Sequence, residues 1–147
     1  MVIYLPPDMI LVSDRSRVSA GFRVQSGDDW PVLRTSHANM LVCGPRDATH
    51  AFILAVTPDL RVPVRDCSAV DALPSSPAEG TLILRDVDAL DGEQQLRLLR
   101  WLDDPRNGRT QVISTTAELL YAAVQTGTFS DWLYYRLNVV HVRVSGN

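Results

Sequence analysis

Histidine, cysteine and serine are the side chains of this sequence that most often do chemistry on their own. His37 and His141 lie far apart in the chain, and neither has a neighbouring Cys, His or Glu cluster of the kind that binds metal. Cys43 and Cys67 match neither a disulfide framework nor paired metal-ligand spacing, and each adjoins a short apolar run. The serines of residues 13–19 lack a nucleophile elbow. The sequence therefore predicts free thiols in a reducing compartment, no metal site and no serine nucleophile.

Composition narrows the class of protein further. The chain has 147 residues, of which 46% are hydrophobic and 21% are charged, which predicts one domain with its own core. The formal net charge of -3 and the lack of a Lys/Arg run argue against direct DNA binding. The sequence shows neither a secretory signal nor an apolar stretch long enough for a bilayer, so we expect a soluble cytoplasmic protein without membrane contact.

From residue 39 onward, apolar runs alternate with helical patterns. Strands are predicted at Met40–Cys43, Arg61–Arg65, Thr81–Leu84, Gln111–Thr115 and Val139–Val144, and helices at Ala48–Val56, Gly92–Leu102 and Ala117–Gln125. Alternating strands and helices predict an α/β fold with a mainly parallel sheet covered on both faces. The segment 1–38 is irregular, and within it Asp28 and Asp29 suggest a short helix through Leu33.

The helix over residues 92–102 has the clearest signals. Asp91 and Gln94 have the spacing of a capping box, which marks a helix start. An apolar face is predicted to follow, formed by Leu96, Leu99 and Leu102 with help from Leu98 and Trp101.

Several segments together resemble one family. They are Gly80–Val87, Leu98–Leu102, Val112–Gly127 and above all Phe129–Val140, with the sequence FSDWLYYRLNVV. The segments resemble, in turn, the Walker B strand, the helix after it, the sensor I region and a late motif of the AAA+ sigma-54-dependent transcription activators. The resemblance implies a three-layer P-loop NTPase-like domain. It also implies a single truncated domain over 1–147, with a divergent segment 1–38, a core 39–145 and no C-terminal helical lid.

Within this resemblance, the phosphate-binding loop aligns with Gly44, Pro45, Arg46, Asp47, Ala48, Thr49, His50 and Ala51. Thr49 stands where the family has its last glycine, and His50 where it has the lysine. Pro45 removes an N–H group, and Asp47 adds negative charge where phosphate would lie. Because each lost charge-assisted hydrogen bond forfeits about 1.5–3 kcal/mol, an ordinary strand-to-helix turn is favoured over a working P-loop.

The positions that the family uses for hydrolysis also differ. Arg85 and Asp86 stand where the Walker B strand ends in two acidic residues, and Ala117 stands where sensor I usually has an asparagine. A guanidinium roughly 4 Å from a divalent cation is repelled by about 8 kcal/mol at an effective dielectric of 20. Arg85 is therefore expected to pair with Asp86, Asp88 or another carboxylate at the sheet edge, or alternatively to occupy the vacated cation site.

The late motif carries candidate interface residues. Of the two arginines that the family offers across a subunit boundary, the first is Ser130 here and the second remains as Arg136. Arg136 either keeps that role or is bonded to a helix end or carboxylate. Trp132, Tyr134 and Tyr135 are candidate interface anchors, although aromatic residues in a helix are also typical of a core.

These observations lead to competing functions. The favoured hypothesis is a non-catalytic pseudo-ATPase module without cofactor, which modulates transcription regulation by contacting a protein partner, either a sigma-54 activator or a second copy of itself. No counterpart of the family's GAFTGA loop lies between Cys67 and Gly80. The alternative is a nucleotide-binding domain with an altered ATP site, in which Arg46 or Arg85 replaces the lysine and ATP and Mg²⁺ are bound. A third hypothesis is a solitary structural or sensory domain whose ligand site involves the first forty residues.

Overall fold

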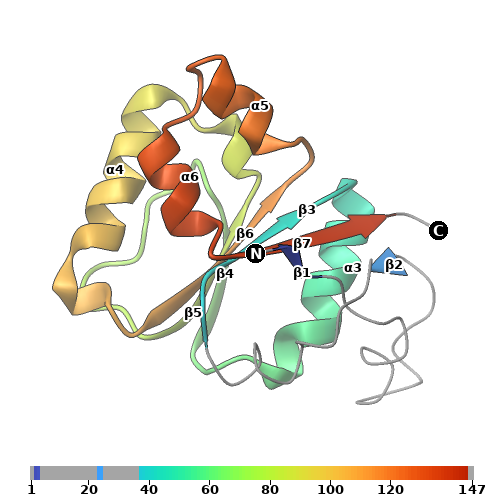
Figure 1. Ribbon diagram of the computed structural model, residues 1–147. Helices are drawn as coiled ribbons and strands as arrows, with labels where there is room; N and C mark the ends of the chain where they lie inside the picture. Colours follow the sequence, from blue (N-terminus) through green and yellow to red (C-terminus); the bar gives the residue numbers. More distant parts are fainter. Residues whose placement is uncertain (1, 4–22, 25–36, 146–147) are drawn as a thin grey trace.

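A computed structural model describes residues 2–3, 23–24 and 37–145 of the chain (Figure 1). The helix predicted after Asp28 and Asp29 and the serines of residues 13–19 lie outside the described residues. Within the described part, no helix has the length and apolar character that a membrane span requires.

A single sheet forms the centre of the molecule. Its strands are β1 (Val2–Ile3), β2 (Arg23–Val24), β3 (Met40–Cys43), β4 (Val64–Ser68), β5 (Gly80–Arg85), β6 (Thr110–Thr116) and β7 (Val140–Ser145). The order is β1-β7-β3-β6-β5-β4, and these neighbours are all parallel, whereas β2 pairs antiparallel with β7. The predicted mainly parallel sheet is confirmed.

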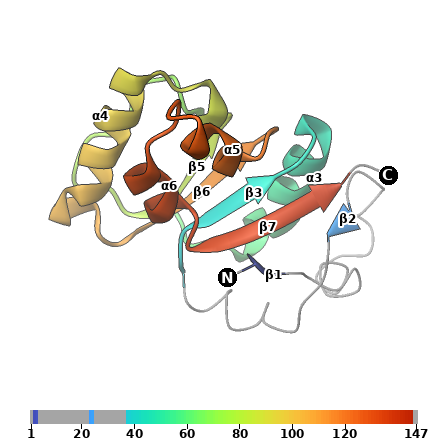
Figure 2. The ribbon, with the colours of Figure 1, turned by 45° about the horizontal axis from the view of Figure 1, so that its top comes forward.

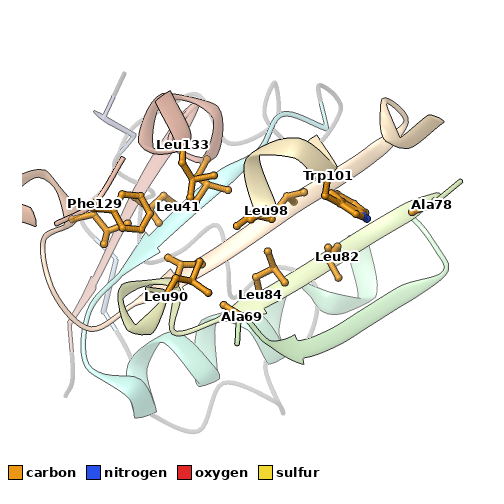
Figure 3. Close-up of a cluster of buried hydrophobic side chains, with 14 residues drawn as sticks. Leu41, Ala69, Ala78, Leu82, Leu84, Leu90, Leu98, Trp101, Phe129 and Leu133 are labelled. Carbon is orange, nitrogen blue, oxygen red and sulfur yellow. The ribbon is translucent and has the colours of Figure 1, made fainter. Parts of the chain in front are cut away.

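Helices cover both faces of this sheet (Figures 1 and 2). The longer helices are α3 (Arg46–Val56), α4 (Gly92–Asp103), α5 (Leu120–Gln125) and α6 (Asp131–Leu137), with single 3-10 turns η1 (Thr57–Asp59), η2 (Val87–Ala89) and η3 (Pro105–Asn107). One buried cluster joins α3 to the sheet side chains of Val42, Ile83 and Ile113. The other joins α4, α5 and α6 to the opposite face, where Leu41 and Leu84 lie (Figure 3). The result is a three-layer α/β/α domain.

The edge strand β4 lies three residues further along the chain than predicted. The prediction of a strand at Arg61–Arg65 was wrong, because Pro63 has no N–H to donate to a neighbouring strand. Its carbonyl instead accepts a hydrogen bond of 3.0 Å from the N–H of Thr81, and pairing with β5 begins at Val64. In the observed register Asp66 lies opposite Ile83 of β5, which belongs to the buried cluster on the α3 side of the sheet.

Helix α4 begins as predicted, and most of its predicted apolar face packs inward. Both hydrogen bonds of the Asp91–Gln94 capping box are present. The buried residues are Gln95, Leu98 and Trp101, whereas Leu96 is exposed, so the prediction of Leu96 on the apolar face was wrong. Leu99 and Leu102 are partly buried against the same cluster, so the rest of the predicted face is confirmed, and Gln95 is buried in addition.

The last two helices, α5 and α6, lie between strands β6 and β7 in the chain. The helix predicted from Ala117 begins three residues later, at Leu120, and Gly127, with φ of 79°, follows its end. Ser130 caps α6 by accepting a hydrogen bond of 3.3 Å from the N–H of Leu133. The buried leucines Leu133 and Leu137 then fix α6 against the sheet.

Candidate functional site

The turn between β3 and α3 is short. It consists of Gly44 and Pro45 alone, because α3 begins at Arg46, two residues before the predicted start. The N–H of Thr49 donates to the carbonyl of Pro45 at 2.9 Å, as in any helix. The Thr49 hydroxyl is buried and donates to the carbonyl of Arg46 at 3.0 Å. Residues from Arg46 onward therefore belong to a helix and do not form an open loop.

Packing explains why a glycine occupies position 44. A Cβ atom built on Gly44 would lie 2.2 Å from the carbonyl oxygen of Val144 on the neighbouring strand β7. The N–H of Gly44 donates to the carbonyl of Thr116 at 3.0 Å. Gly44 therefore lies tightly between β7 and β6, and its N–H is already bonded within the protein.

Arg85, the last residue of β5, binds a carboxylate on the neighbouring edge strand. Its Nε donates to Oδ1 of Asp66 at 2.9 Å, and its Nη2 donates to Oδ2 of the same residue at 2.7 Å. This bidentate geometry matches the planar fork of a guanidinium to a carboxylate. Of the partners foreseen from the sequence, Asp66 is the carboxylate at the sheet edge, and the side chain of Arg85 is 20% exposed.

The same guanidinium also contacts His50, the residue expected from the sequence at the family's lysine position. The distance from Nη1 of Arg85 to Nδ1 of His50 is 3.0 Å. An arginine only donates hydrogen bonds, so this contact requires the lone pair of Nδ1 and places the ring proton of a neutral imidazole on Nε2. Arg85 thus connects α3, β5 and β4 through side chains.

A second ion pair lies beside the first. Nε of Arg46, at the start of α3, is 3.3 Å from Oδ1 of Asp86. Asp86 has a left-handed backbone with φ of 61°, which aspartate tolerates better than most residues. Its N–H donates to the hydroxyl of Thr115 on β6 at 3.1 Å. The turn after β5 is therefore held by contacts on both sides.

The charges of this group balance. Two guanidinium groups, on Arg46 and Arg85, pair with two carboxylates, on Asp86 and Asp66. The exposed side chain of Asp47 adds a further negative charge at the first turn of α3. Hereafter, the paired cluster means Arg46, His50, Asp66, Arg85 and Asp86.

The sensor position adds no polar side chain. Ala117 is exposed and lies just beyond the end of β6. The hydrogen bonds of this connection come from its neighbours, since the Thr116 hydroxyl donates to the carbonyl of Glu118 at 2.8 Å. Ala117 itself presents a methyl group.

On the opposite face of the sheet, α6 presents two large aromatic side chains outward. Trp132 is 75% exposed and Tyr135 is 67% exposed. Tyr134 is half-buried, its ring centroid lies 5.5 Å from that of Tyr135, and its hydroxyl accepts a bond of 3.0 Å from Asn138. Trp132 and Tyr135 are therefore not core residues of this chain, which was the alternative to an interface role.

Arg136 of the same helix is bonded within the chain. Its Nη2 donates to the carbonyl of Leu102 at 3.0 Å, at the end of α4, and its Nη1 pairs with the carboxylate of Asp103. These are a helix end and a carboxylate, the partners of the structural alternative. The contacts tie α6 to α4.

The cysteines and histidines do not form a reactive centre in the described part of the chain. Burial raises the pKa of the Cys43 thiol above its usual value, and its Sγ lies 3.5 Å from the carbonyl of Glu118. Burial also raises the pKa of Cys67. A raised thiol pKa disfavours the nucleophilic thiolate. Among the described residues, no three His, Cys, Asp or Glu side chains are placed to hold a metal ion.

Sequence reasoning missed two residues that organise these surfaces. Asp66 was missed because its strand was placed three residues too early, which hid its position beside Arg85. Gln95 was missed because its side chain is polar. Its amide nitrogen donates to the carbonyls of Leu90 and Thr128 at 3.0 Å each, and its Oε1 accepts from the N–H of Ser130 at 2.8 Å. The available signal was the spacing, because Gln95 lies three residues before Leu98 and therefore on the same face of the helix.

The strand order and the helices on both faces give the α/β fold of a P-loop NTPase-like AAA+ domain. A family model described as the sigma-54 interaction domain matches residues 49–146. The chain belongs to the sigma-54 interaction domain family, as the motif at Phe129–Val140 indicated. Among curated protein sequences, the comparison found no significant match.

Solved structures share this fold. NtrX from Brucella abortus in complex with ATP is similar with a TM-score of 0.61 and 23% identity, over 78% of this chain and 34% of that chain. The structure of the same protein with ADP gives a TM-score of 0.60 and 23% identity, over 78% and 33%. A further NtrX structure gives 0.54 and 22% identity, over 90% and 39%. This chain thus spans about a third of the length of these relatives.

Proposed function

We propose that this chain is a non-catalytic sigma-54-activator-like module, which modulates transcription regulation in the cytoplasm through contacts with a protein partner. The observation that carries the proposal is the bidentate pair between Arg85 and Asp66, extended by the contact of Arg85 with His50. Arg85 stands where the family places a carboxylate for Mg²⁺, and His50 where it places the lysine for phosphate. At that position the hydrogen-bonding groups of Arg85, Asp66 and His50 are bonded to one another.

The residues present do not fit a triphosphate with Mg²⁺. A triphosphate needs an excess of positive charge and several free N–H groups. The paired cluster has two positive and two negative side chains, the N–H of Gly44 is bonded to the carbonyl of Thr116, and Pro45 has no N–H. Binding phosphate would require at least one ion pair to separate.

Titration calorimetry with ATP and with ADP, each with and without Mg²⁺, tests this proposal. We expect no saturable heat at millimolar nucleotide, while an activator that hydrolyses ATP serves as the positive control. Saturable binding of one nucleotide per chain would contradict a site closed by its own ion pairs and favour the alternative of altered nucleotide binding.

One observation supports the alternative of altered nucleotide binding. The side chain of Arg46 is 78% exposed, and its pair with Asp86 is a single contact of 3.3 Å. Such exposed pairs are worth little, so Arg46 could exchange Asp86 for a phosphate at small cost. Under this alternative ATP binds, and Arg46→Ala abolishes the binding while Arg97→Ala, on the exposed surface of α4, leaves it unchanged.

The outward aromatic residues of α6 support the protein-contact part of the proposal. Large exposed aromatics are enriched among the residues that dominate protein interfaces. Because AAA+ subunits associate head to tail, a subunit of this kind could dock on one face of an active subunit and limit its assembly.

Mixing experiments test this contact. The purified chain is added to a sigma-54 activator from the same organism, and oligomer size and ATPase rate are measured. We expect both to change, and we expect Trp132→Ala with Tyr135→Ala to remove the change. Leu54→Ala, at an exposed apolar position of α3 on the other face of the sheet, is the matched control. An unchanged oligomer and rate at saturating concentration would contradict the proposal.

A further inference from the structure

A hollow lined by none of the paired-cluster residues lies elsewhere on the molecule. It has a volume of about 400 Å³ and is formed by η2, the connection from β6 to α5, α5 itself and the loop before α6. These elements follow the carboxyl ends of β5 and β6 (Figure 1), the edge at which parallel sheets most often bind ligands. The side chains that matter below are Asp88, Leu90, Glu118, Leu120, Thr128 and Phe129.

The polar side chains of this hollow are hydrogen-bond acceptors. Asp88 and Glu118 are exposed carboxylates, and neither forms an ion pair with any described residue. The hydroxyls of Thr126 and Thr128 each lie 3.2 Å from the carbonyl of Ala123 and 3.3 Å from each other, so their protons are used within the chain while lone pairs remain to accept hydrogen bonds. A ligand that matches these walls must donate hydrogen bonds and carry positive charge.

The base of the hollow is apolar. Leu90, Leu120 and Phe129 line it and are themselves almost fully buried, so they form a firm floor. A ligand that matches this floor has an apolar body beside its cationic group.

We propose that this hollow binds a small organic cation, a primary amine on a short apolar body. Its ammonium group lies between Asp88 and Glu118 and donates to their carboxylates, while the apolar body contacts Leu90 and Phe129. The volume is within the range of small-molecule sites, about 300–1,000 Å³, and is too small to enclose more than a side chain or two of a protein partner. The site shares no residue with the paired cluster.

Phenylbutylamine is a suitable probe, with phenylbutyrate as the probe of opposite charge. Amide chemical shifts of the full chain are followed by NMR during titration with each compound. We expect saturable shifts at Leu90, Leu120 and Phe129 with the amine and none with the acid. Asp88→Asn with Glu118→Gln should raise the Kd at least tenfold, whereas Glu93→Gln, an exposed carboxylate of α4, should leave it within twofold.

Both variants change surface side chains only, and unchanged amide dispersion and Tm establish that they fold. Equal binding of amine and acid, shifts outside the hollow, or a double variant that binds as the parent does would overturn the proposal. Tenfold tighter binding of a short Phe-Lys peptide, with shifts that spread over the outer face of α5, would also overturn it, in favour of a docking site for a basic protein segment.

Discussion

The paired cluster around Arg85 and the aromatic surface of α6 lie on opposite faces of one sheet, and they differ in how their side chains are satisfied. In the cluster, each charged group has a partner within the chain, and Arg85 has two, Asp66 and His50. On α6, Trp132 and Tyr135 expose most of their surface. The comparison teaches that the charged side chains of the paired cluster are bonded within the chain, while the large exposed aromatic side chains lie on α6.

The largest effect is expected at the turn that begins the cluster. Gly44→Ala should lower the free energy of unfolding by about 3 kcal/mol, because the new Cβ would meet the carbonyl of Val144 at 2.2 Å. Urea denaturation measures this loss. Gly92→Ala, where a Cβ would meet nothing within 4 Å, is the control and should cost nothing. A loss of less than about 1 kcal/mol at Gly44 would show that packing does not require this glycine.

Within the cluster, Asp66→Asn should lower the free energy of unfolding by about 1–2 kcal/mol, because Arg85 loses the charge of its bidentate partner. The value is modest since the Asp66 side chain is 45% exposed. Glu93→Gln removes an exposed pair of 3.8 Å with Arg97 and should have little effect in the same denaturation experiment. Equal losses in the two variants would contradict a structural role for the Arg85–Asp66 pair.

The sequence predicted the core of this fold well, because its strands carry unambiguous apolar runs. Met40–Cys43 matches β3 at both ends, and β5 and β6 extend the predicted strands by one or two residues. The family assignment was also available, since the motif at Phe129–Val140 is long. Predictions failed where several local signals compete, as with Pro63 before the start of β4 and Leu96 in the leucine-rich helix α4.

The contacts of the candidate site were only partly predictable. The sequence indicated that Arg85 needs a carboxylate, but the choice of Asp66 depends on the register of β4 against β5. Likewise, the sequence placed Arg136 near either a subunit boundary or a carboxylate, and the packing of α4 against α6 supplies Asp103. Pairing across strands and helices is decided by tertiary geometry, which local patterns do not contain.

His141 on β7, whose Nδ1 lies 3.1 Å from Oδ1 of Asn138 at the end of α6, offers a pH-dependent test of stability. Burial, followed by the charge of Arg143, lowers the pKa of His141 from its ordinary value of 6.5. The unfolded chain therefore binds more protons than the folded chain once the pH falls through 6.5, and stability should decrease there. His141→Gln should flatten this dependence in denaturation curves measured from pH 7.5 to pH 5. The same slope in both proteins would exclude His141 as its source.

The smallest effect on stability is expected at the outward aromatics. Trp132→Ala and Tyr135→Ala should each change the free energy of unfolding by less than about 0.5 kcal/mol, because both side chains lie mostly in solvent. Thermal and urea denaturation provide the measurement. A loss above about 1.5 kcal/mol would mean that α6 needs these rings for folding, and would remove the contrast with the paired cluster.

A crystal structure of the chain grown with millimolar ATP and Mg²⁺ tests the central claim most directly. The account predicts that Arg85 keeps its hydrogen bonds to Asp66 and His50, and that the turn of Gly44 and Pro45 holds no triphosphate. A triphosphate seated at the start of α3, with Arg46 or Arg85 turned toward it, would contradict the account.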